Sequence, residues 1–237
     1  MKRFLSLVCL LCTQFLFSEN GVIWQQVSGS WKIDKIGEES FLYDIRTNGY
    51  KFNYSELINN NSIRTLASFK YDRISLKLNA YNPVSKSAFA VFFDSPGDYR
   101  EFSAFRFTGS KTEITKIEYI TSRVKDTTLP RDRKLNFEVK TLEEKNVSLP
   151  YSANHIIEIS FKKNRTVLSI NEKDIMSVEN KDRPEASQLG LYHTGNLLKV
   201  FYFEVFDGRK PVIMDNFSTD TIRRSTVKAT VEKNSTN

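Results

Sequence analysis

HIIEISFKKNRTVLSINEKDIMSVENKDRPEASQLGLYHTGNLLKVFYFEVF, residues 155–206, is the stretch that decides the fold class of this chain. Apolar and polar side chains alternate across 157–161, and a second apolar run follows a polar turn at 166–170. Since successive side chains of a strand point to opposite faces of a sheet, the alternation predicts antiparallel strands with one buried and one solvated face. A polar loop with a proline separates the remaining predicted strands, which are 175–178, 188–192 and 197–206.

The rest of the chain repeats this strand pattern. The clearest alternation places Ile74, Leu76, Leu78 and Ala80 on one face, and residues 135–139 repeat it. Turn-forming pairs separate about a dozen such short runs, and the single weak helical candidate spans 55–60. We therefore predict an all-β domain. Two runs that are apolar on both faces predict central strands, 88–93 and 200–206.

The order of elements within 155–206 resembles a known superfamily. A strand ends in a polar turn at Asn171, and the sequence then continues with Leu189-Gly190-Leu191-Tyr192 and the aromatic strand Phe201–Val205. This order resembles the C-terminal half of concanavalin A-like jelly rolls, the superfamily of laminin-G-like domains, legume-type lectins and some glucanases. Residues 24–31 are similar to the opening strand of such domains. The resemblance implies an antiparallel two-sheet jelly-roll sandwich.

The residues that carry the resemblance are expected to serve the core. Gly190 allows the backbone to pass close to a neighbouring strand. Leu189, Leu191 and Phe203 are expected to fill the space between two sheets about 10 Å apart. The resemblance thus specifies the fold more than the function.

The N-terminus has the pattern of a signal peptide. Lys2 and Arg3 precede an apolar run from Phe4 to Phe17, and Ser18 provides a small residue for cleavage. At about fourteen residues, this run is shorter than the roughly twenty needed to cross a bilayer. We therefore predict export to the periplasm or the extracellular space, with no integral membrane span.

The predicted cleavage also removes both cysteines, Cys9 and Cys12, so the mature chain holds no disulfide. An exported, disulfide-free chain is typical of bacteria; the alternative at this end is lipidation of a mature N-terminal cysteine. Residues 1–18 are thus the predicted signal peptide and 19–217 a single sandwich domain. The polar segment 218–237 is the predicted flexible, mobile C-terminal tail.

The charge balance excludes one class of partner. The 35 Lys and Arg against 28 Asp and Glu give a net charge of +7, and no block of five basic residues occurs. A mild excess spread along an exported chain is typical of a solvated surface and argues against a nucleic-acid partner. The sequence predicts no cofactor and no metal site, since it lacks an Asp-rich loop.

The sequence contains no complete set of catalytic residues. Glycosidases of the resembled superfamily carry carboxylates on one strand as Glu-x-Asp-x-x-Glu. The nearest match here, Glu172, Asp174 and Glu179, has too long a final spacing and begins in a predicted turn. Neither His155 nor His193 belongs to a nucleophile motif. We therefore predict that the protein is not an enzyme.

Loops at the ends of a sandwich are the usual places for recognition. His193 is placed by the sequence in the loop between the last two long strands, and a second polar loop follows residue 93. Asp94, Asp98 and Glu101 are an alternative calcium cluster in that second loop. The tryptophans and tyrosines are expected in the core more often than against a sugar ring. The predicted ligand-binding residues are Asp94, Asp98, Tyr99, Tyr192, His193 and Asn196.

Three functions follow as hypotheses. The first is a non-catalytic binding module for a glycan or another exported protein. The second is a structural subunit of a periplasmic or surface assembly, such as a flagellar filament sheath, that uses edge strands and the C-terminal tail. The third, a glycoside hydrolase, rests on analogy with the resembled superfamily. The sequence carries no signal for an oligomeric state.

Overall fold

The computed structural model describes residues 22–27, 29–44, 61–81, 88–96, 101–124, 137–179, 183–194 and 197–224. These residues form strands and turns, with no helix among them, which confirms the predicted all-β fold class. None of them belongs to a helix long and apolar enough to cross a membrane. The strands are β1 (Trp24–Gln26), β2 (Trp31–Ile36), β3 (Glu39–Asp44), β4 (Asn61–Thr65), β5 (Arg73–Tyr81), β6 (Ala88–Ser95), β7 (Glu101–Gly109), β8 (Glu113–Val124), β9 (Phe137–Pro150), β10 (His155–Lys162), β11 (Arg165–Ile170), β12 (Lys173–Glu179), β13 (Gln188–His193), β14 (Leu197–Asp207), β15 (Lys210–Asp215) and β16 (Ile222–Arg223).

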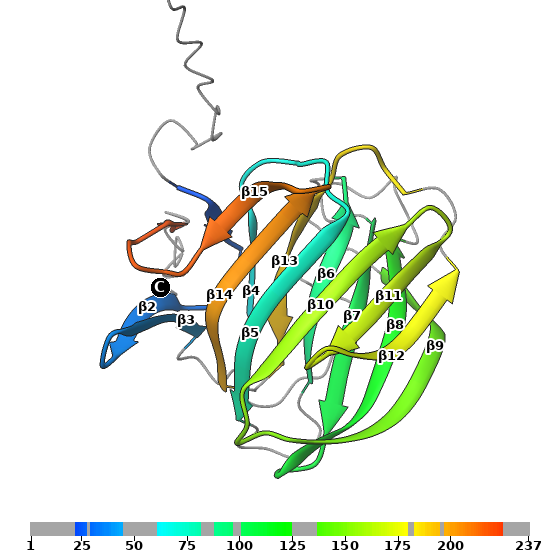
Figure 1. The fold of residues 1–237 in the computed structure, drawn as a ribbon, viewed down its shortest axis with the longest axis horizontal. Helices are drawn as coiled ribbons and strands as arrows, with labels where there is room; N and C mark the ends of the chain where they lie inside the picture. The colour runs from blue at the N-terminus through cyan, green and yellow to red at the C-terminus, as the bar shows by residue number, and fades with distance from the viewer. Residues whose placement is uncertain are drawn as a thin grey trace, which may run out of the picture.

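The strands form two sheets that pack face to face. The first sheet has the order β16-β1-β4-β13-β6-β7-β8-β9, and the second has the order β12-β11-β10-β5-β14-β3-β2, with β15 paired to β14. In Figure 1 the second sheet lies in front of the first. Neighbouring strands run antiparallel except for β1 and β16, which pair in parallel. The predicted antiparallel two-sheet sandwich is thus confirmed.

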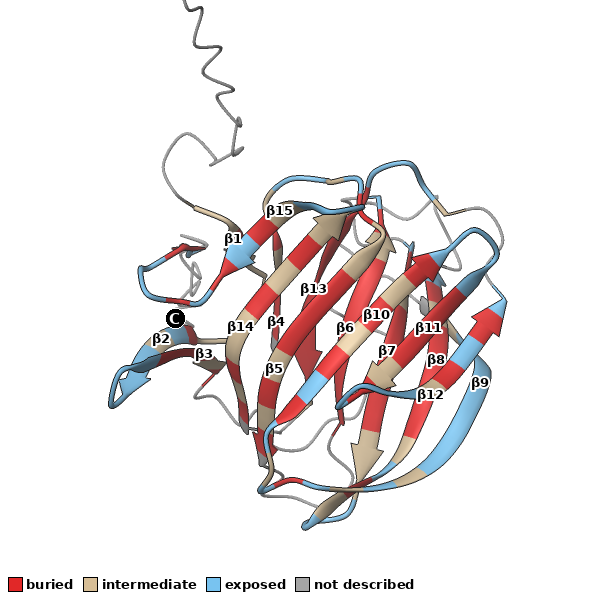
Figure 2. Cartoon of the chain, in the orientation of Figure 1, coloured by how far each residue is buried: buried red, intermediate tan, exposed pale blue. Residues whose placement is uncertain are grey.

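The core fills the space between the sheets, and alternation explains how it forms. The residues of β5 that were predicted to share a buried face, from Ile74 to Ala80, are fully buried. On the facing sheet the rings of Phe89 and Phe107 stack with their centroids 4.6 Å apart. Burying one such side chain contributes roughly 2–3 kcal/mol. Buried and less buried positions alternate along several strands in Figure 2.

Gly190 lies where β13 passes between β4 and β6. A Cβ atom at this position would lie 2.1 Å from the carbonyl oxygen of Ile63 and 2.7 Å from the ring of Phe92. Real Cβ atoms essentially never approach so closely. The close approach of the backbone that the sequence predicted at Gly190 is therefore confirmed.

Asp215 ties the two ends of the described chain together. Its Oδ2 accepts hydrogen bonds from Nε1 of Trp24 at 2.7 Å and from Oγ1 of Thr221 at 2.7 Å. Its Oδ1 accepts one from the backbone N–H of Phe217 at 2.8 Å. All four residues are buried. A single carboxylate thus holds β1, β15 and residues 216–222 in one arrangement.

This arrangement corrects the predicted start of the mobile tail. Ile222, which is 5% exposed, belongs to β16 and pairs with Trp24 of β1. The segment from Ser218 to Arg224 therefore continues the sandwich, because its few apolar residues fit against β1. Residues 225–237 lie outside the described residues, as do the predicted signal peptide, 1–18, and the weak helical candidate, 55–60.

β9 forms one edge of the first sheet and is exposed along most of its length, as Figure 2 shows. The sequence predicted one buried face near 135–139, and in the structure Val139 is half-buried. Nζ of Lys145 donates a hydrogen bond of 2.7 Å to the backbone oxygen of Ile175 in β12. This bond joins the edges of the two sheets.

Substituting Gly190 with alanine is expected to destabilise the protein by about 3 kcal/mol, because the new methyl group overlaps the backbone of β4. Gly37→Ala is the control. Its Cβ would meet nothing within 4 Å, and only its φ of +63° is unfavourable, which costs about 1 kcal/mol. Urea denaturation of both variants measures the difference. Equal destabilisation would contradict the steric explanation.

Candidate functional site

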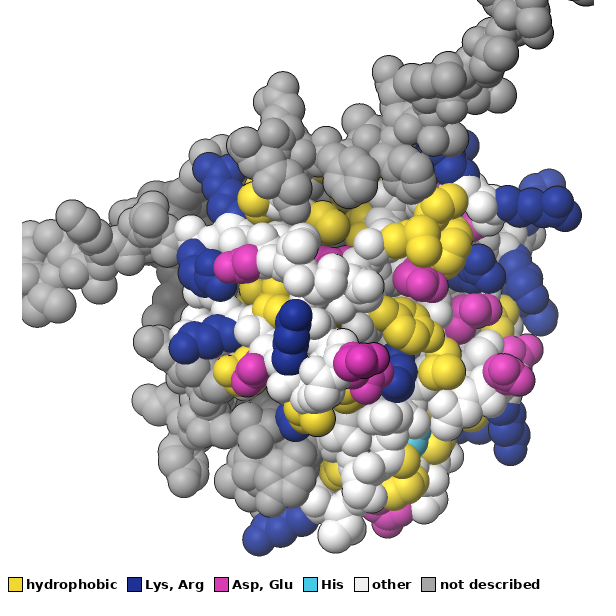
Figure 3. Space-filling view, turned by 60° about the vertical axis from the view of Figure 1, so that its left-hand side comes forward, with side chains coloured by type: hydrophobic (Ala, Val, Ile, Leu, Met, Phe, Trp, Pro, Cys, Tyr) yellow, Lys and Arg dark blue, Asp and Glu magenta, His cyan; other side chains and the backbone are white. Residues whose placement is uncertain are grey.

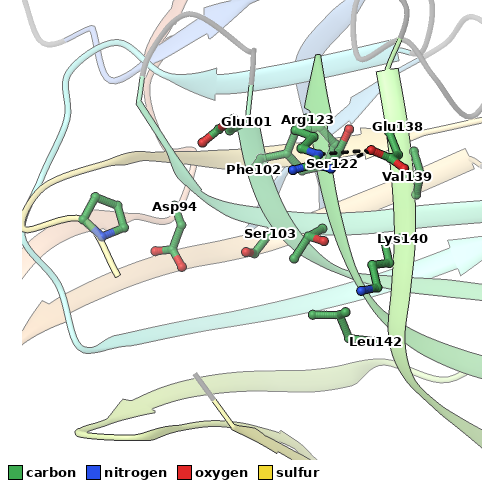
Figure 4. Close-up of a pocket in the computed structure, with 12 residues that line it drawn as sticks. Asp94, Glu101, Phe102, Ser103, Ser122, Arg123, Glu138, Val139, Lys140 and Leu142 are labelled. Carbon is green, nitrogen blue, oxygen red and sulfur yellow. Dashed lines mark hydrogen bonds and ion pairs between the residues drawn. The ribbon is translucent and has the colours of Figure 1, made fainter. Parts of the chain in front are cut away.

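A hollow of about 750 Å³ opens at one end of the sandwich, where β6 and β8 end and β7 and β9 begin. Figure 4 shows its lining side chains, which come from these four strands. Pro184, just before β13, also lines the hollow. The site is therefore built on paired strands, which hold side chains more precisely than loops.

Strand register places the polar residues of the hollow in two rows. Ser103 of β7 pairs with Thr121 of β8, which pairs with Lys140 of β9. Directly paired residues have Cβ atoms about 5 Å apart. A second row, two residues further along each strand, crosses the same strands in the order Glu101, Arg123 and Glu138. We call these six residues the two polar rows.

The charges in the polar rows are available to a ligand. Nε and Nη2 of Arg123 donate to Oε2 of Glu138 at 3.1 and 3.0 Å. The two side chains are 69% and 46% exposed, so this pair adds little stability and exchanges readily. Lys140 forms no ion pair with another described residue. The rows thus present donors and acceptors beside the apolar Leu142, which is 44% exposed.

Asp94, a predicted ligand-binding residue, lies in the wall of this hollow. Its carboxylate accepts hydrogen bonds from Nε of Arg183 at 3.0 Å and from Nη2 at 2.8 Å. The guanidinium of Arg183 also lies 3.5 Å from the ring centroid of Phe161. Burial raises the pKa of Asp94, and the Arg183 guanidinium offsets part of that rise. The ion pair between Asp94 and Arg183 therefore fixes this part of the wall of the hollow.

A short chain of hydrogen bonds continues from Asp94 to Tyr71 and Ser187. The backbone N–H of Asp94 donates to Oη of Tyr71 at 3.1 Å, and that hydroxyl pairs with Oγ of Ser187 at 2.8 Å. Burial raises the pKa of Tyr71, so its hydroxyl remains protonated at neutral pH. Asp94 itself has a φ of 58°, a conformation that this bonded surrounding holds in place. The end of β6 and the residue before β13 are thus fixed to one another.

His193, predicted in an exposed loop, is the last residue of β13 and is fully buried. Nε2 of its ring lies 3.1 Å from Oδ2 of Asp44, and the ring stands edge-on to Trp31 at 5.5 Å. The exposed placement is therefore corrected, because β13 continues one residue past Tyr192 between β4 and β6. Among the described residues, Nδ1 of His193 has no hydrogen-bond partner.

The other predicted site residues are placed as follows. Tyr192 is 5% exposed and packs on the outer face of the first sheet against Phe102, with ring centroids 6.3 Å apart. Asp98, Tyr99 and Asn196 lie outside the described residues. The two polar rows were not predicted, apart from Glu101 as a calcium ligand. Trp24, Trp31 and Tyr119 are buried, as expected of core aromatics.

The outer face of the first sheet carries a second apolar cluster and a buried ion pair. Nε of Arg106 lies 2.9 Å from Oε2 of Glu118, and Nζ of Lys116 lies 3.1 Å from Oε1. Burial alone would raise the pKa of Glu118, but Arg106 and Lys116 outweigh it and lower the pKa below its ordinary value. A general acid needs a raised pKa. The cluster consists of Ala90, Phe92, Phe102, Ala104, Ile120 and Tyr192.

The carboxylates that came closest to a glycosidase pattern lie elsewhere. Glu172 is in the turn before β12, as predicted, with a φ of 67°. Asp174 accepts a hydrogen bond of 2.6 Å from Oγ of Ser169, and Glu179 ends the edge strand β12. All three carboxylate residues are exposed, and none lines the hollow described above. Within the described residues, no group of three or more His, Cys, Asp or Glu is arranged to hold a metal ion.

Comparisons with known proteins identify the fold class. No protein-family model and no curated protein sequence matches the chain. Its structure is similar to a mixed-linkage-glucan glycoside hydrolase family 16 protein of Bacteroides ovatus, with a TM-score of 0.56 and 11% identity over 78% of this chain and 94% of that one. It is also similar to carbohydrate-binding module CBM66 of Bacillus subtilis, with a TM-score of 0.52 and 13% identity over 76% and 91% of the two chains.

These matches show that the protein has a concanavalin A-like jelly-roll fold, which confirms the resemblance found in residues 155–206. At 11% and 13% identity, they show the fold alone. One similar structure is a hydrolase and the other a binding module. The fold therefore does not by itself decide between catalysis and binding.

Glu118→Gln is expected to lower the free energy of unfolding by about 3 kcal/mol at pH 7, because the buried Arg106 loses its ion pair with the Glu118 carboxylate. The folded-state pKa of Glu118 lies below the ordinary value of 4.5. Its stabilising contribution is therefore full above about pH 4.5 and is lost as the pH falls through the folded-state pKa.

Urea denaturation of wild type and variant from pH 7 to pH 3 measures this effect, and the two stabilities are expected to converge at the acidic end. Glu144→Gln is the control, since that carboxylate is 63% exposed and lies 3.6 Å from Lys116. It is expected to cost less than about 1 kcal/mol. A constant gap between Glu118→Gln and wild type across this range would contradict the assignment.

Proposed function

We propose that the protein is an exported, non-catalytic module that binds a glycan in the hollow bounded by the two polar rows. The observation that carries this proposal is the pairing of the rows across β7, β8 and β9, which puts six polar side chains on one rigid surface. Sugars offer many hydroxyl groups and apolar C–H faces. Charged and hydroxyl side chains beside Leu142 complement both.

The fold supports this proposal. A carbohydrate-binding module and a glucan hydrolase bound to a product share the arrangement of strands. The periplasmic or extracellular location rests on the signal-peptide pattern of residues 1–18. An exported jelly roll of this kind meets polysaccharides in either compartment.

The state of the carboxylates supports binding over hydrolysis. Glycoside hydrolysis needs a carboxylic acid to protonate the leaving group and a second carboxylate opposite it. Glu118, outside the hollow, has a lowered pKa. Burial raises the pKa of Asp94, but both of its carboxylate oxygens accept hydrogen bonds from Arg183. Glu138 is paired with Arg123. Each of these three carboxylates is bound to a cation, so Glu101 is the one carboxylate lining the hollow that has no cation partner among the described residues, and hydrolysis needs two. We therefore propose a role without turnover.

A second candidate function, membership of a surface assembly, is supported by β9. Its fourteen residues form an edge of the first sheet, and most of them are exposed. An edge strand offers unpaired backbone groups to a partner strand. The partner in this second candidate would be another exported protein.

The test is a glycan array probed with the mature protein, followed by calorimetric titration of the glycans that bind. Arg123→Gln and Lys140→Gln are each expected to weaken binding at least about tenfold, because each removes a charge-assisted hydrogen bond. Lys35→Gln in the exposed β2–β3 hairpin is the control and is expected to bind like wild type.

No release of reducing ends from a bound glycan is expected. Binding that is unchanged in both pocket variants would refute the assigned site. The absence of any bound glycan, together with co-purification of one exported protein that is lost when β9 is altered, would favour the second candidate.

A further inference from the structure

A second hollow, of about 450 Å³, lies on the second sheet at the same end of the molecule. It is formed by the start of β5, the end of β10 and the turn between β14 and β15. These three segments meet at the upper end of the sandwich in Figure 1. The residues that matter here are Asp72, Arg73, Phe161, Lys162 and Arg209.

Strand pairing brings three cations to this hollow from distant parts of the chain. Arg73 pairs with Ser160 of β10 on one side and with Phe206 of β14 on the other. Lys162 lies two residues beyond Ser160, and Arg209 follows β14 in the turn. Elsewhere, basic and acidic side chains are intermixed over the surface that Figure 3 shows.

Arg73 is oriented by an aromatic ring. Its guanidinium lies 4.1 Å from the ring centroid of Phe206, a cation–π contact. Its ion pair with Glu158 spans 3.9 Å between half-exposed side chains. It donates no hydrogen bond to another described residue. The guanidinium is thus held in place while its N–H groups stay available to a ligand.

The acidic residue in this hollow is already engaged. Oδ2 of Asp72 accepts a hydrogen bond of 3.0 Å from the backbone N–H of Gly208. The backbone N–H of Asp72 donates to the Phe206 oxygen at 2.9 Å, and its oxygen accepts from Phe161 at 2.7 Å. Lys162 and Arg209 form no ion pair with any described residue. The backbone of this hollow is therefore held rigidly. The basic side chains around it outnumber the acidic side chains that could neutralise them.

We propose that this second hollow binds an anionic group, a carboxylate or a sulfate, carried by the glycan that occupies the first hollow. The inference rests on the proposed function and deepens it, because it assigns the ligand to the class of acidic glycans. Guanidinium and ammonium groups bind carboxylate and sulfate oxygens through charge-assisted hydrogen bonds.

A chain of side-chain contacts links the walls of the two hollows. Phe161 is one of the residues that line the second hollow, and its ring, on the buried face of β10, lies 3.5 Å from the guanidinium of Arg183. Arg183 in turn holds Asp94 in the wall of the first hollow. Phe93, next to Asp94, also contacts Phe161, with centroids 5.0 Å apart. An extended acidic oligosaccharide that crosses these contacts would reach both hollows.

The test compares three probes on the mature protein by calorimetric titration: an oligogalacturonate, its methyl-esterified form of the same length, and inorganic sulfate. The acidic oligosaccharide is expected to bind at least about tenfold more tightly than the esterified one, with an advantage that shrinks as salt rises. The double variant Lys162→Gln/Arg209→Gln is expected to abolish that advantage and to leave binding of the esterified probe unchanged.

The matched control is Lys32→Gln/Lys35→Gln, which removes the same charge from exposed positions of β2 and is expected to keep the preference. Equal affinity for the acidic and esterified probes would overturn the inference while leaving the proposed glycan function intact. An equal loss in the control pair would overturn it by showing a diffuse charge effect. Binding of sulfate without binding of either oligosaccharide would overturn it as well, whereas the glycan array decides separately whether the glycan function stands.

Discussion

Aromatic rings fill the narrow space between the two sheets, and their packing fixes the register of the strands. Phe93 contacts Phe105 and Tyr119 within its own sheet and Phe161 across the layer. A slip of one residue in any of these strands would turn its rings to the opposite face. Because interiors are close-packed, such a slip is excluded. Every polar residue on the same strands is therefore held at a defined place.

The candidate site follows from this constraint. On β7 the inward positions change from Phe105 to Ser103 to Glu101, and on β8 they change from Tyr119 to Thr121 to Arg123. The inward face thus becomes polar toward the end of the sandwich, where the hollow opens. The hollow is a continuation of the interior in which hydrogen-bonding groups replace apolar ones. Its geometry is as well determined as that of the core beside it.

Local alternation predicted the fold well and the site poorly, for one physical reason. The faces of β5 follow from residues next to each other in the sequence, and the glycine itself indicates the close approach at position 190, although the atoms it approaches belong to the distant residues Ile63 and Phe92. The polar rows depend on the register among β7, β8 and β9. Asp94 was predicted, but its partner Arg183 is 89 residues away. No local pattern indicates such a pairing.

The two corrected predictions have the same origin. β13 is buried on both faces, so the alternation of apolar and polar residues does not indicate whether a polar residue there is buried. For this reason the sequence placed His193 in an exposed loop. The few apolar residues after Ser218 suggested a mobile tail, yet Ile222 needs only the neighbouring β1 to be buried. Composition measures how much apolar surface a segment has. It does not show whether a neighbouring strand is available to cover that surface.

The outer face of the first sheet explains why ligand contacts are expected at the end of the sandwich. A second apolar cluster occupies this face, and beside it Glu118 is enclosed by Arg106 and Lys116. Replacing Glu118 would take away the carboxylate that Lys116 and the buried Arg106 share. This outer face thus contributes to the stability of the fold, and the Glu118 carboxylate on it stays ionised. The hydrogen-bonding groups of the polar rows, by contrast, are exposed and rigidly spaced, which is the combination that recognition of a polar ligand requires.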